Sequence, residues 1–408
     1  MAEYADREHY LPIRKADLVD LLAADPRVAA EREPFRQLCR LIGAIWHFEY
    51  LGTLDRLKDT YAPFDPDSVT PPLKPPSGDQ RTARMDQFFE QFVALMERAN
   101  YKRLSRNDID AAIEGGASDW GVNMHVDFDV FERLELFVRG EVKSPRTKRH
   151  WLFIWRTEQK KVDAYQRLVL LLKLRKHKRV PDFLDTDDVF IKVFKDVPKL
   201  DLEMVLPGTS LQMPIVQKWK MGSTLVGTFG YALYSVGAQL WTGFKVLLGL
   251  SVAAVATATN VLWGPVILLA GYGYKQYYSY QVTKQTYAKM LTESLYFQNL
   301  DNNLGVLTQT VDEAEEQEVR ETVLGYFYLW KYAPPEGWTA AQLDDYIELE
   351  LEGKLGMKVD FEIGDALEKL EKLHLVTRTG DRYHAVALAQ ALELLDERWD
   401  NYFQYHRG

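Results

Sequence analysis

The sequence predicts an α+β membrane protein with four parts: a helical N-terminal region, an antiparallel β-rich middle region, a two-helix transmembrane hairpin, and a C-terminal helical region with a winged-helix-like module. Three observations predict this fold class. The N-terminal part has apolar residues at helical spacing, and the segment after residue 122 has short runs of alternating or continuous apolar residues. The 54 residues from Met221 to Tyr274 carry Lys245 as their only formal charge. With 408 residues, the chain exceeds the usual size of a single core, so more than one domain is expected.

Residues 1–121 are expected to form the helical N-terminal region. The apolar side chains at helical spacing in "EPFRQLCRLIGAIWHFEY" are Phe35, Leu38, Ile42, Ile45 and Trp46. His47 in this segment is expected to be a core histidine with a hydrogen-bond partner. Residues 62–81 hold six prolines. Proline can neither continue a helix nor donate to a β-ladder, so this segment is expected to be an extended surface loop.

Residues 122–216 are expected to form a basic, β-rich domain. Its short apolar runs, rich in Val, Phe and Trp, predict a meandering antiparallel sheet. Between Arg139 and Arg179 there are fourteen Lys or Arg residues against three acids. The candidate membrane-surface or partner patch at the end of this run is Lys173, Arg175, Lys176, Lys178 and Arg179. The alternatives are a solvated face, a surface that contacts the acidic run 312–318, and RNA binding. RNA binding is the weakest of these, because the sequence contains no recognisable RNA-binding motif.

Residues 217–298 are expected to form the transmembrane hairpin and its flanks, with arms within about 225–258 and 262–280. Twelve Leu, Ile or Val residues between 246 and 274 favour insertion by roughly 4 to 7 kcal/mol, against about 2.5 to 3.5 kcal/mol for one central lysine. The predicted turn consists of Asn260, Gly264 and Pro265. The alternatives are a re-entrant pair of short helices and a wholly soluble core.

Three further residues in the hairpin are candidates for pore lining or helix packing. Small residues let helices approach closely in lipid, and a charge inside a span marks a functional position. These residues are Lys245, Gly237 and Gly243. Lysines precede and follow the hairpin but are absent from its turn, which predicts that both termini lie in the cytoplasm.

Residues 299–408 are expected to form a C-terminal domain that is helical and winged-helix-like. Two helical patterns are followed by a hairpin around Gly380 and Asp381, and this order is typical of a winged helix. The second helix, "GDALEKLEKLHLV", is as acidic as it is basic, with Asp365, Glu368 and Glu371 against Lys369 and Lys372. A helix that enters a nucleic-acid groove should be basic, so protein contact is favoured over nucleic-acid binding.

No enzyme, cofactor or metal signature is present. The chain lacks a phosphate-binding glycine loop, HExxH and GxSxG, so we expect no cofactor and lean against an enzyme. His125 and Asp127 share one strand face but have no third ligand at an informative spacing, so no metal is expected. The single Cys39 fits a reducing compartment, and a formal charge of −9 argues against a nucleic-acid partner.

Several segments together resemble the transmembrane protein 143 family. They include "HFEYLGTLDRLKDTYAPFDPD", "VFERLELFVRG", "IKVFKDVPKLDLEMVLPG" and "LGVLTQTVDEAEEQEVRETVLGYFYLW", and the resemblance extends over roughly residues 10–400. The resemblance implies a two-pass membrane protein built around a domain of unknown function. The family has no assigned activity, so the resemblance assigns no functional residues to this chain. Animal relatives are thought to be mitochondrial, but the N-terminus lacks transit-peptide character, so a bacterial inner membrane is the expected location.

Two functions are expected from these observations. The first is a membrane-anchored interaction or scaffold module that faces the cytoplasm, with the lipid bilayer and a protein partner, or a second copy of the chain, as its partners. The alternative is a subunit of a homo-oligomeric channel or transport assembly, since two spans per chain enclose a pathway only when several copies assemble.

Overall fold

The computed structural model describes residues 8–70, 72–116, 123–149, 157–178, 180, 184–199, 202, 205–207, 209–212 and 296–403, together with isolated positions between 271 and 289. The chain divides into two compact units. The first combines Met1–Ser105, Asp129–Pro198 and Asn299–Gly408, and the second combines Arg106–Phe128 and Lys199–Gln298. Each unit is therefore assembled from segments that are far apart in the sequence.

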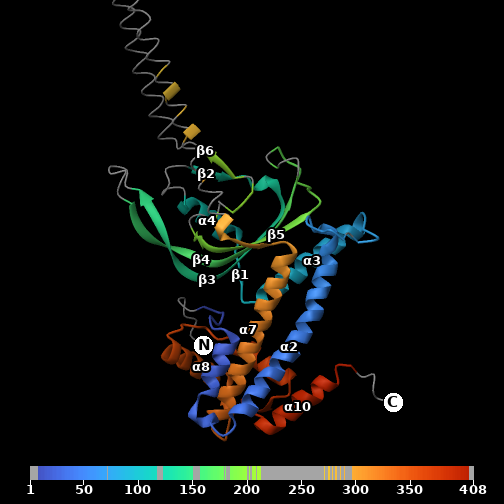
Figure 1. Cartoon of the computed structure of the whole chain (residues 1–408), viewed down its shortest axis with the longest axis vertical. Helices are drawn as coiled ribbons and strands as arrows, with labels where there is room; N and C mark the ends of the chain where they lie inside the picture. The colour runs from blue at the N-terminus through green and yellow to red at the C-terminus, as the bar shows by residue number, and fades with distance from the viewer. Residues whose placement is uncertain are drawn as a thin grey trace, which may run out of the picture. The chain divides into compact units, whose positions relative to one another are not determined.

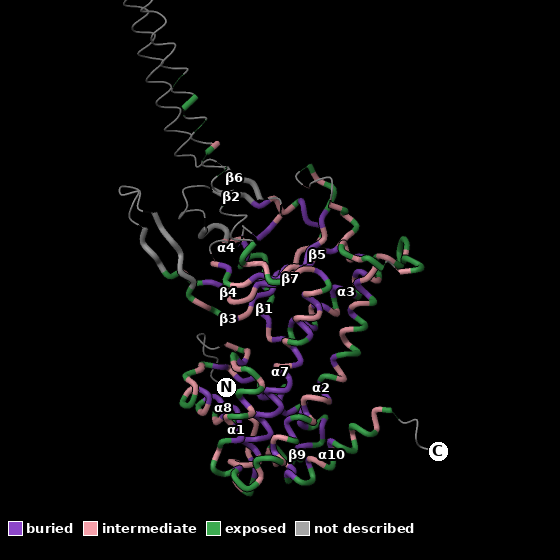
Figure 2. Tube along the Cα trace, in the orientation of Figure 1, coloured by how far each residue is buried: buried purple, intermediate pink, exposed green. Residues whose placement is uncertain are grey.

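Four helices form the framework of the first unit: α1 (Lys15–Ala23), α2 (Arg32–Tyr61), α3 (Asp79–Arg98) and α7 (Leu304–Lys331). Helices α2 and α7 lie side by side, and α1 and α3 also pack on α7 (Figure 1). Helix α7 is buried along most of its length, as Figure 2 shows, with apolar residues such as Val323 and Phe327 in the core. A helix surrounded in this way must also bury polar side chains, and each of those needs a partner.

A five-stranded antiparallel sheet completes this unit, in the order β1-β3-β4-β5-β7. Its strands are β1 (Lys102–Arg103), β3 (Phe131–Arg149), β4 (Thr157–Leu174), β5 (Val189–Pro198) and β7 (Asn299–Asn302). Strands β3 and β4 form a long hairpin in which Leu136 faces Leu170. Phe137, Val169 and Ile191 from three adjacent strands join the same core as the helices. The sheet therefore packs against the helical framework through its apolar face.

The last part of the first unit has the element order of a winged helix. After α7 come β8 (Trp338–Thr339), α8 (Ala340–Leu355), α9 (Ile363–Lys372), β9 (Val376–Thr379) and β10 (Arg382–Ala385). The sheet order is β8-β10-β9, and α10 (Leu388–Asp400) then packs along α2. Thr339 and Gln342 form a reciprocal capping box at the start of α8. Gly380, at φ 67°, makes the β9–β10 turn, a backbone conformation that favours glycine.

The described part of the second unit contains α4 (Arg106–Gly116) and the antiparallel pair β2 (Asn123–Val126) and β6 (Thr209–Gln212). The Arg106 guanidinium lies 3.3 Å from the centroid of the Phe128 ring and pairs with Asp110 at 3.1 Å. This contact fixes the beginning of α4 on the segment that follows β2.

The structure contradicts the prediction of a transmembrane hairpin. Among the residues described here, no helix is both long enough and apolar enough to cross a membrane. Helices α2 and α7 have sufficient length, with 30 and 28 residues, but charged side chains recur along both of them. The described fold is a mixture of helices and sheets. The predictions of an integral membrane protein and of an inner-membrane location depended on the hairpin, and this finding contradicts them. The channel alternative depended on the same spans and is not carried further.

The residues singled out within that hairpin lie outside the described part of the chain. They are Gly237, Gly243, Lys245, Asn260, Gly264 and Pro265.

Candidate functional site

A buried lysine on α9 is surrounded by three carboxylates. The side chain of Lys369 is 6% exposed, and its Nζ lies 2.5 Å from Glu318 Oε2 and 2.6 Å from Asp365 Oδ2. The same Nζ donates to Glu321 Oε2. Glu318 and Glu321 are three residues apart on α7, so both point toward α9, whereas Asp365 lies one turn before Lys369 on α9 itself. The ion pairs therefore fasten α9 to the central helix.

Hydrogen bonds from neighbouring elements hold these carboxylates in place. The Tyr50 hydroxyl on α2 donates to Glu318 Oε1 at 2.9 Å. Gln317 Nε2 donates to Glu321 Oε1 at 2.7 Å, and Asn100 Nδ2, just after α3, donates to the same oxygen at 3.2 Å. Glu318 Oε2 has no partner with hydrogen-bond geometry, so its contact with Lys369 is an ion pair only. The cluster thus connects α2, α3, α7 and α9.

In this cluster, burial and the neighbouring charges shift the pKa values in opposite directions. Burial raises the pKa of Glu321 to about 7, although Lys369 and Gln317 oppose the shift. Burial by itself would lower the pKa of Lys369, but the carboxylates of Glu321, Glu318 and Asp365 together raise it above its ordinary value. The lysine is therefore charged, and Glu321 titrates near neutral pH.

The three carboxylates also have the spacing of a cation site, since their oxygens lie within 4.8 Å of one another. Carboxylate oxygens are the usual ligands of hard divalent cations. Here the Lys369 ammonium lies in contact with all three groups and occupies the position that such an ion would take. The arrangement is therefore an internal ion-pair cluster and not a metal centre.

A second set of polar contacts holds the outer face of α9 against α2 and α10. Lys372 Nζ lies 2.5 Å from Glu49 Oε2, and Arg398 Nη2 lies 3.2 Å from Glu49 Oε1. The Tyr402 hydroxyl donates to Glu49 Oε1 at 3.1 Å, and Lys372 Nζ lies 4.8 Å from the centroid of the Trp46 ring. Both lysines of α9 are thus engaged within the chain. In a nucleic-acid-binding winged helix, this helix would need its basic side chains for phosphates.

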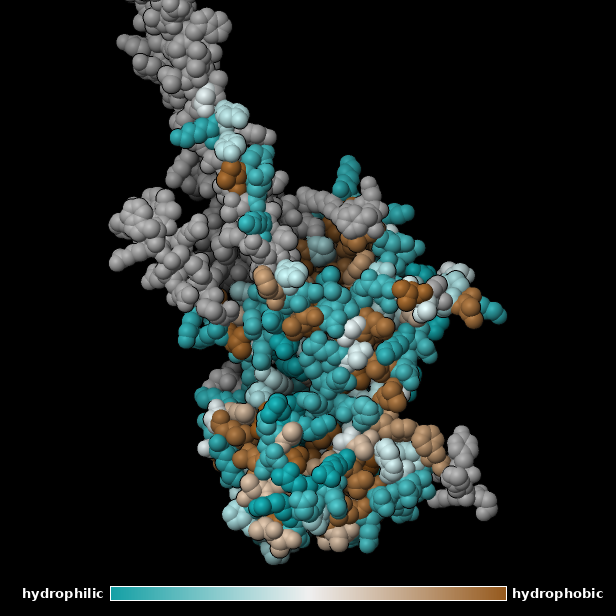
Figure 3. Space-filling model, viewed as in Figure 1, coloured by the Kyte–Doolittle hydropathy of each residue, from teal (hydrophilic) through white to brown (hydrophobic). Residues whose placement is uncertain are grey.

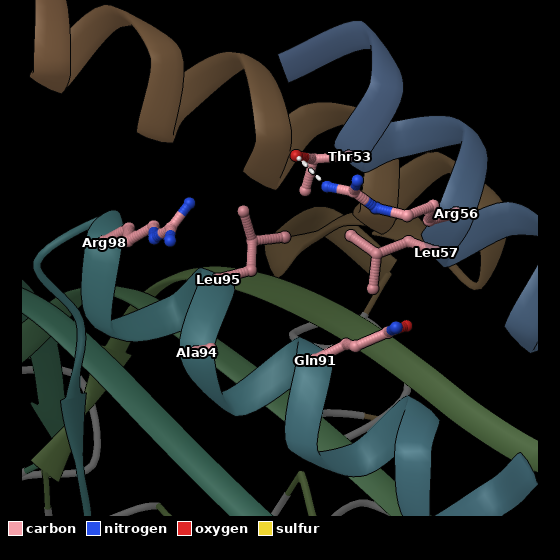
Figure 4. Close-up of a pocket in the computed structure, with 7 residues that line it drawn as sticks. All are labelled: Thr53, Arg56, Leu57, Gln91, Ala94, Leu95 and Arg98. Atoms are coloured by element: carbon pink, nitrogen blue, oxygen red, sulfur yellow. Dashed lines mark hydrogen bonds between the residues drawn. The ribbon is translucent and has the colours of Figure 1, made fainter. Parts of the chain in front are cut away.

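Two adjacent pockets lie beside this junction and share Thr53, Arg56 and Arg98. The larger has a volume of about 370 Å³ and extends toward Lys369 and Lys372. The smaller has a volume of about 180 Å³ and lies between α2 and α3 (Figure 4). In Figure 4, Arg56 and Arg98 reach from the two helices toward the space between them, and Arg56 donates to Thr53 Oγ1 at 3.1 Å. Leu57, Ala94 and Leu95 are the apolar residues that line this space, and Gln91 also lines it.

The proline-rich segment forms a surface loop between α2 and α3. Val69 and Leu73 are the most exposed large apolar residues of the described chain, at 92% and 103% of their reference areas. Figure 3 shows hydrophobic side chains on the part that projects beyond the ends of these two helices. The base of the loop is fixed, because Asp67 accepts a hydrogen bond from Asn303 Nδ2 at 2.5 Å and Ser68 N donates to Asp65 O at 3.3 Å.

The predicted basic patch is only partly a free surface. Lys173 is paired with Glu132 at 2.9 Å, whereas Arg175, Lys176 and Lys178 are exposed. Arg179 lies outside the described residues. Earlier in the basic run, Arg139 pairs at 2.7 Å with Glu313 of the acidic run on α7. Some of the basic residues therefore have acidic partners within the first unit.

The prediction for His47 is wrong about its burial. Its side chain is 68% exposed, and its Nδ1 lies 2.8 Å from Glu315 Oε2. His47 follows two buried residues on α2, but it points out of the core, because helical neighbours differ by about 100° in direction. The Lys369 cluster and the arginine pair were not predicted from the sequence. Both depend on contacts between helices that are distant in the chain.

A comparison with known families matches residues 165–305, about a third of the chain, to the family described as "Protein of unknown function (DUF3754)". The matched segment includes most of β4, all of β5, β6 and β7, and the first residues of α7. No solved structure matches the chain. The chain is thus similar over this segment to proteins without an assigned function, and the resemblance to the transmembrane protein 143 family stays a prediction.

Proposed function

We propose that this protein is an interaction scaffold that binds a protein partner through the loop between α2 and α3. The observation that carries the proposal is the pair of almost fully exposed apolar residues, Val69 and Leu73, within a proline-rich segment. Large apolar side chains normally lose exposure on folding, and a projecting group of them marks a contact surface.

The sequence of the loop indicates how a partner would bind. In "PPLKPP", Pro72 and Pro75 are three residues apart, a spacing that would place them on one edge of a polyproline II helix with three residues per turn. The described residues from Pro72 to Ser77 form neither helix nor strand. Leu73 and Lys74, between these prolines, form a bend in the free chain. In the proposal the segment straightens on binding and docks as a polyproline II helix in an aromatic-lined groove of the SH3, WW or EVH1 kind.

The winged-helix module supports a scaffold role over a nucleic-acid role. Its second helix, α9, uses Lys369 and Lys372 for contacts with α7 and α2. The exposed side chains that remain on α9 include Glu368 and Glu371, which would repel phosphates. In this proposal the module stabilises the body that carries the loop.

The test is a titration of the full chain with a panel of isolated SH3, WW and EVH1 domains. At least one domain should bind with a micromolar Kd, and a double variant with Pro72→Ala and Pro75→Ala should weaken that binding by about tenfold or more. Leu349→Ser is the matched control, because Leu349 is an exposed leucine on α8, away from the loop in sequence. It should leave the Kd unchanged. A Kd weaker than about 1 mM for every domain would refute the proposal.

A further inference from the structure

Arg56 and Arg98 direct two positive charges into one pocket. Neither guanidinium has a carboxylate within 4.0 Å in the part of the chain that the structure describes. Arg56 donates to the neutral hydroxyl of Thr53. Arg98 lies near the Tyr50 hydroxyl, whose pKa is raised by burial and by Glu318, with Arg98 opposing the shift. Like charges that face a common space favour an anion between them.

The two pockets differ in the charges that line them. In the larger pocket, Lys369 and Lys372 are paired with acids, and Glu49, Glu318, Asp365 and Glu368 all belong to its lining. In the smaller pocket, between α2 and α3, the charged residues in the lining are Arg56 and Arg98. Guanidinium groups bind carboxylates in a planar, bidentate geometry, and two of them can hold one carboxylate from both sides.

The smaller pocket continues from the arginines into an apolar recess. Leu57 and Leu95 form its walls with Ala94, and Gln91 lies at its far side (Figure 4). The Oε1 atom of Gln91 is buried and has no hydrogen-bond partner. A water molecule in the recess would satisfy this oxygen, since an apolar chain has no hydrogen-bond donor. The recess thus offers apolar walls and one polar contact.

We propose that this pocket binds a small amphipathic carboxylate. The carboxylate lies between Arg56 and Arg98, and its short apolar chain enters the recess beside Leu57 and Leu95. The volume of about 180 Å³ sets the size of the ligand. Since an apolar cavity of about 150 Å³ holds one benzene molecule, a chain of roughly six carbons fits.

The test is calorimetric titration of the full chain with hexanoate. Hexanoate should bind saturably, and Arg56→Gln and Arg98→Gln should each weaken binding by about tenfold or more, since a hydrogen bond to a charged group contributes about 1.5 to 3 kcal/mol. Arg40→Gln is the matched control, because Arg40 is an exposed arginine of the same helix α2 that does not line the pocket. It should change the Kd by less than about twofold.

A second variant tests the apolar recess separately from the charges. Ala94→Leu fills the recess and leaves both arginines in place, so it should weaken hexanoate binding and leave the binding of inorganic phosphate unchanged. Hexanol, which has the chain without the charge, should bind at least about tenfold more weakly than hexanoate. Circular dichroism melts establish that each variant is folded. Absence of saturable hexanoate binding below about 10 mM would overturn the site. Equal affinity for hexanoate and phosphate, with no effect of Ala94→Leu, would overturn the assignment of an amphipathic ligand.

Discussion

Replacement of Lys369 by methionine should destabilise the protein strongly, and more at high pH than at low pH. The change removes the positive charge but keeps the length of the side chain. It leaves Glu318 and Glu321, at 7% and 2% side-chain exposure, without the cation that compensates them. Removing one partner of a buried ion pair costs about 3 to 5 kcal/mol, because the other charge stays buried.

The pH dependence follows from the cost of neutralising these carboxyls. Protonating a glutamate with a reference pKa of about 4.3 costs about 5 kcal/mol at pH 8 and about 1 kcal/mol at pH 5. We therefore expect Lys369→Met to lower the free energy of unfolding by roughly 3 to 5 kcal/mol at pH 8 and by roughly 1 to 2 kcal/mol at pH 5. Neutralising the carboxylates as well, in the triple variant with Glu318→Gln and Glu321→Gln, should recover much of the loss.

The assay is urea denaturation followed by tryptophan fluorescence and circular dichroism at both pH values. Lys372→Met is the matched control, since Lys372 is on the same helix and also contacts a carboxylate but is about half exposed. It should cost no more than about 1 kcal/mol. A loss below about 1 kcal/mol for Lys369→Met at pH 8, or the same loss at both pH values, would refute the reasoning about the buried cluster.

Three further substitutions test other features of the structure. Burial raises the pKa of Glu321 to about 7 in the folded protein, so the folded state binds more protons than the unfolded state between about pH 4.5 and 7, and the stability should fall as the pH rises through this window. Glu321→Gln should flatten that part of the stability profile measured by urea denaturation, and an unchanged slope would contradict the assignment. Gly140→Ala should lower stability by about 1 to 3 kcal/mol, because Gly140 has φ +70° and an added Cβ would lie 2.6 Å from Gln166 Oε1. Gly52→Ala in α2, where nothing lies within 4 Å of the added Cβ, should instead stabilise the protein by about 0.5 to 1 kcal/mol. Equal melting temperatures for the two alanine variants would contradict this difference.

Local patterns in the sequence were sufficient to predict much of the helical framework. The residues at helical spacing between Phe35 and Trp46 are all buried on one side of α2, because their period is a property of the local chain. The order of elements from Trp338 to Ala385 could also be read locally, since capping residues and a turn glycine mark its boundaries.

The junction between α9 and α7 could not be predicted in this way. Asp365 and Lys369 are one turn apart in a charged segment, which by sequence alone resembles a solvated helix face. Glu318 and Glu321 lie in and just after a run of acids that looks equally exposed. Only the packing of α7 in the centre of its unit shows that these charges are buried together. Nothing local connects Arg56 with Arg98 either.

The transmembrane prediction had a different weakness. Length and apolarity show that a segment is compatible with a bilayer, but they do not show that the folded chain places a helix across one. The basic run was read as a single surface for a similar reason. Pairing of β3 with β4 and contact with α7 instead give Arg139 and Lys173 acidic partners, and these contacts depend on the tertiary fold.

The most direct test of the scaffold proposal is hydrogen–deuterium exchange of the full chain with and without the polyproline-binding domain that binds it best. The amides of Val69, Thr70, Leu73, Lys74 and Ser77 should be protected in the complex, because these residues lie in the loop that would enter the groove. The rest of the described chain should exchange as it does in the free protein. Protection confined to α9 or to the β9–β10 hairpin, with the loop unchanged, would contradict the account.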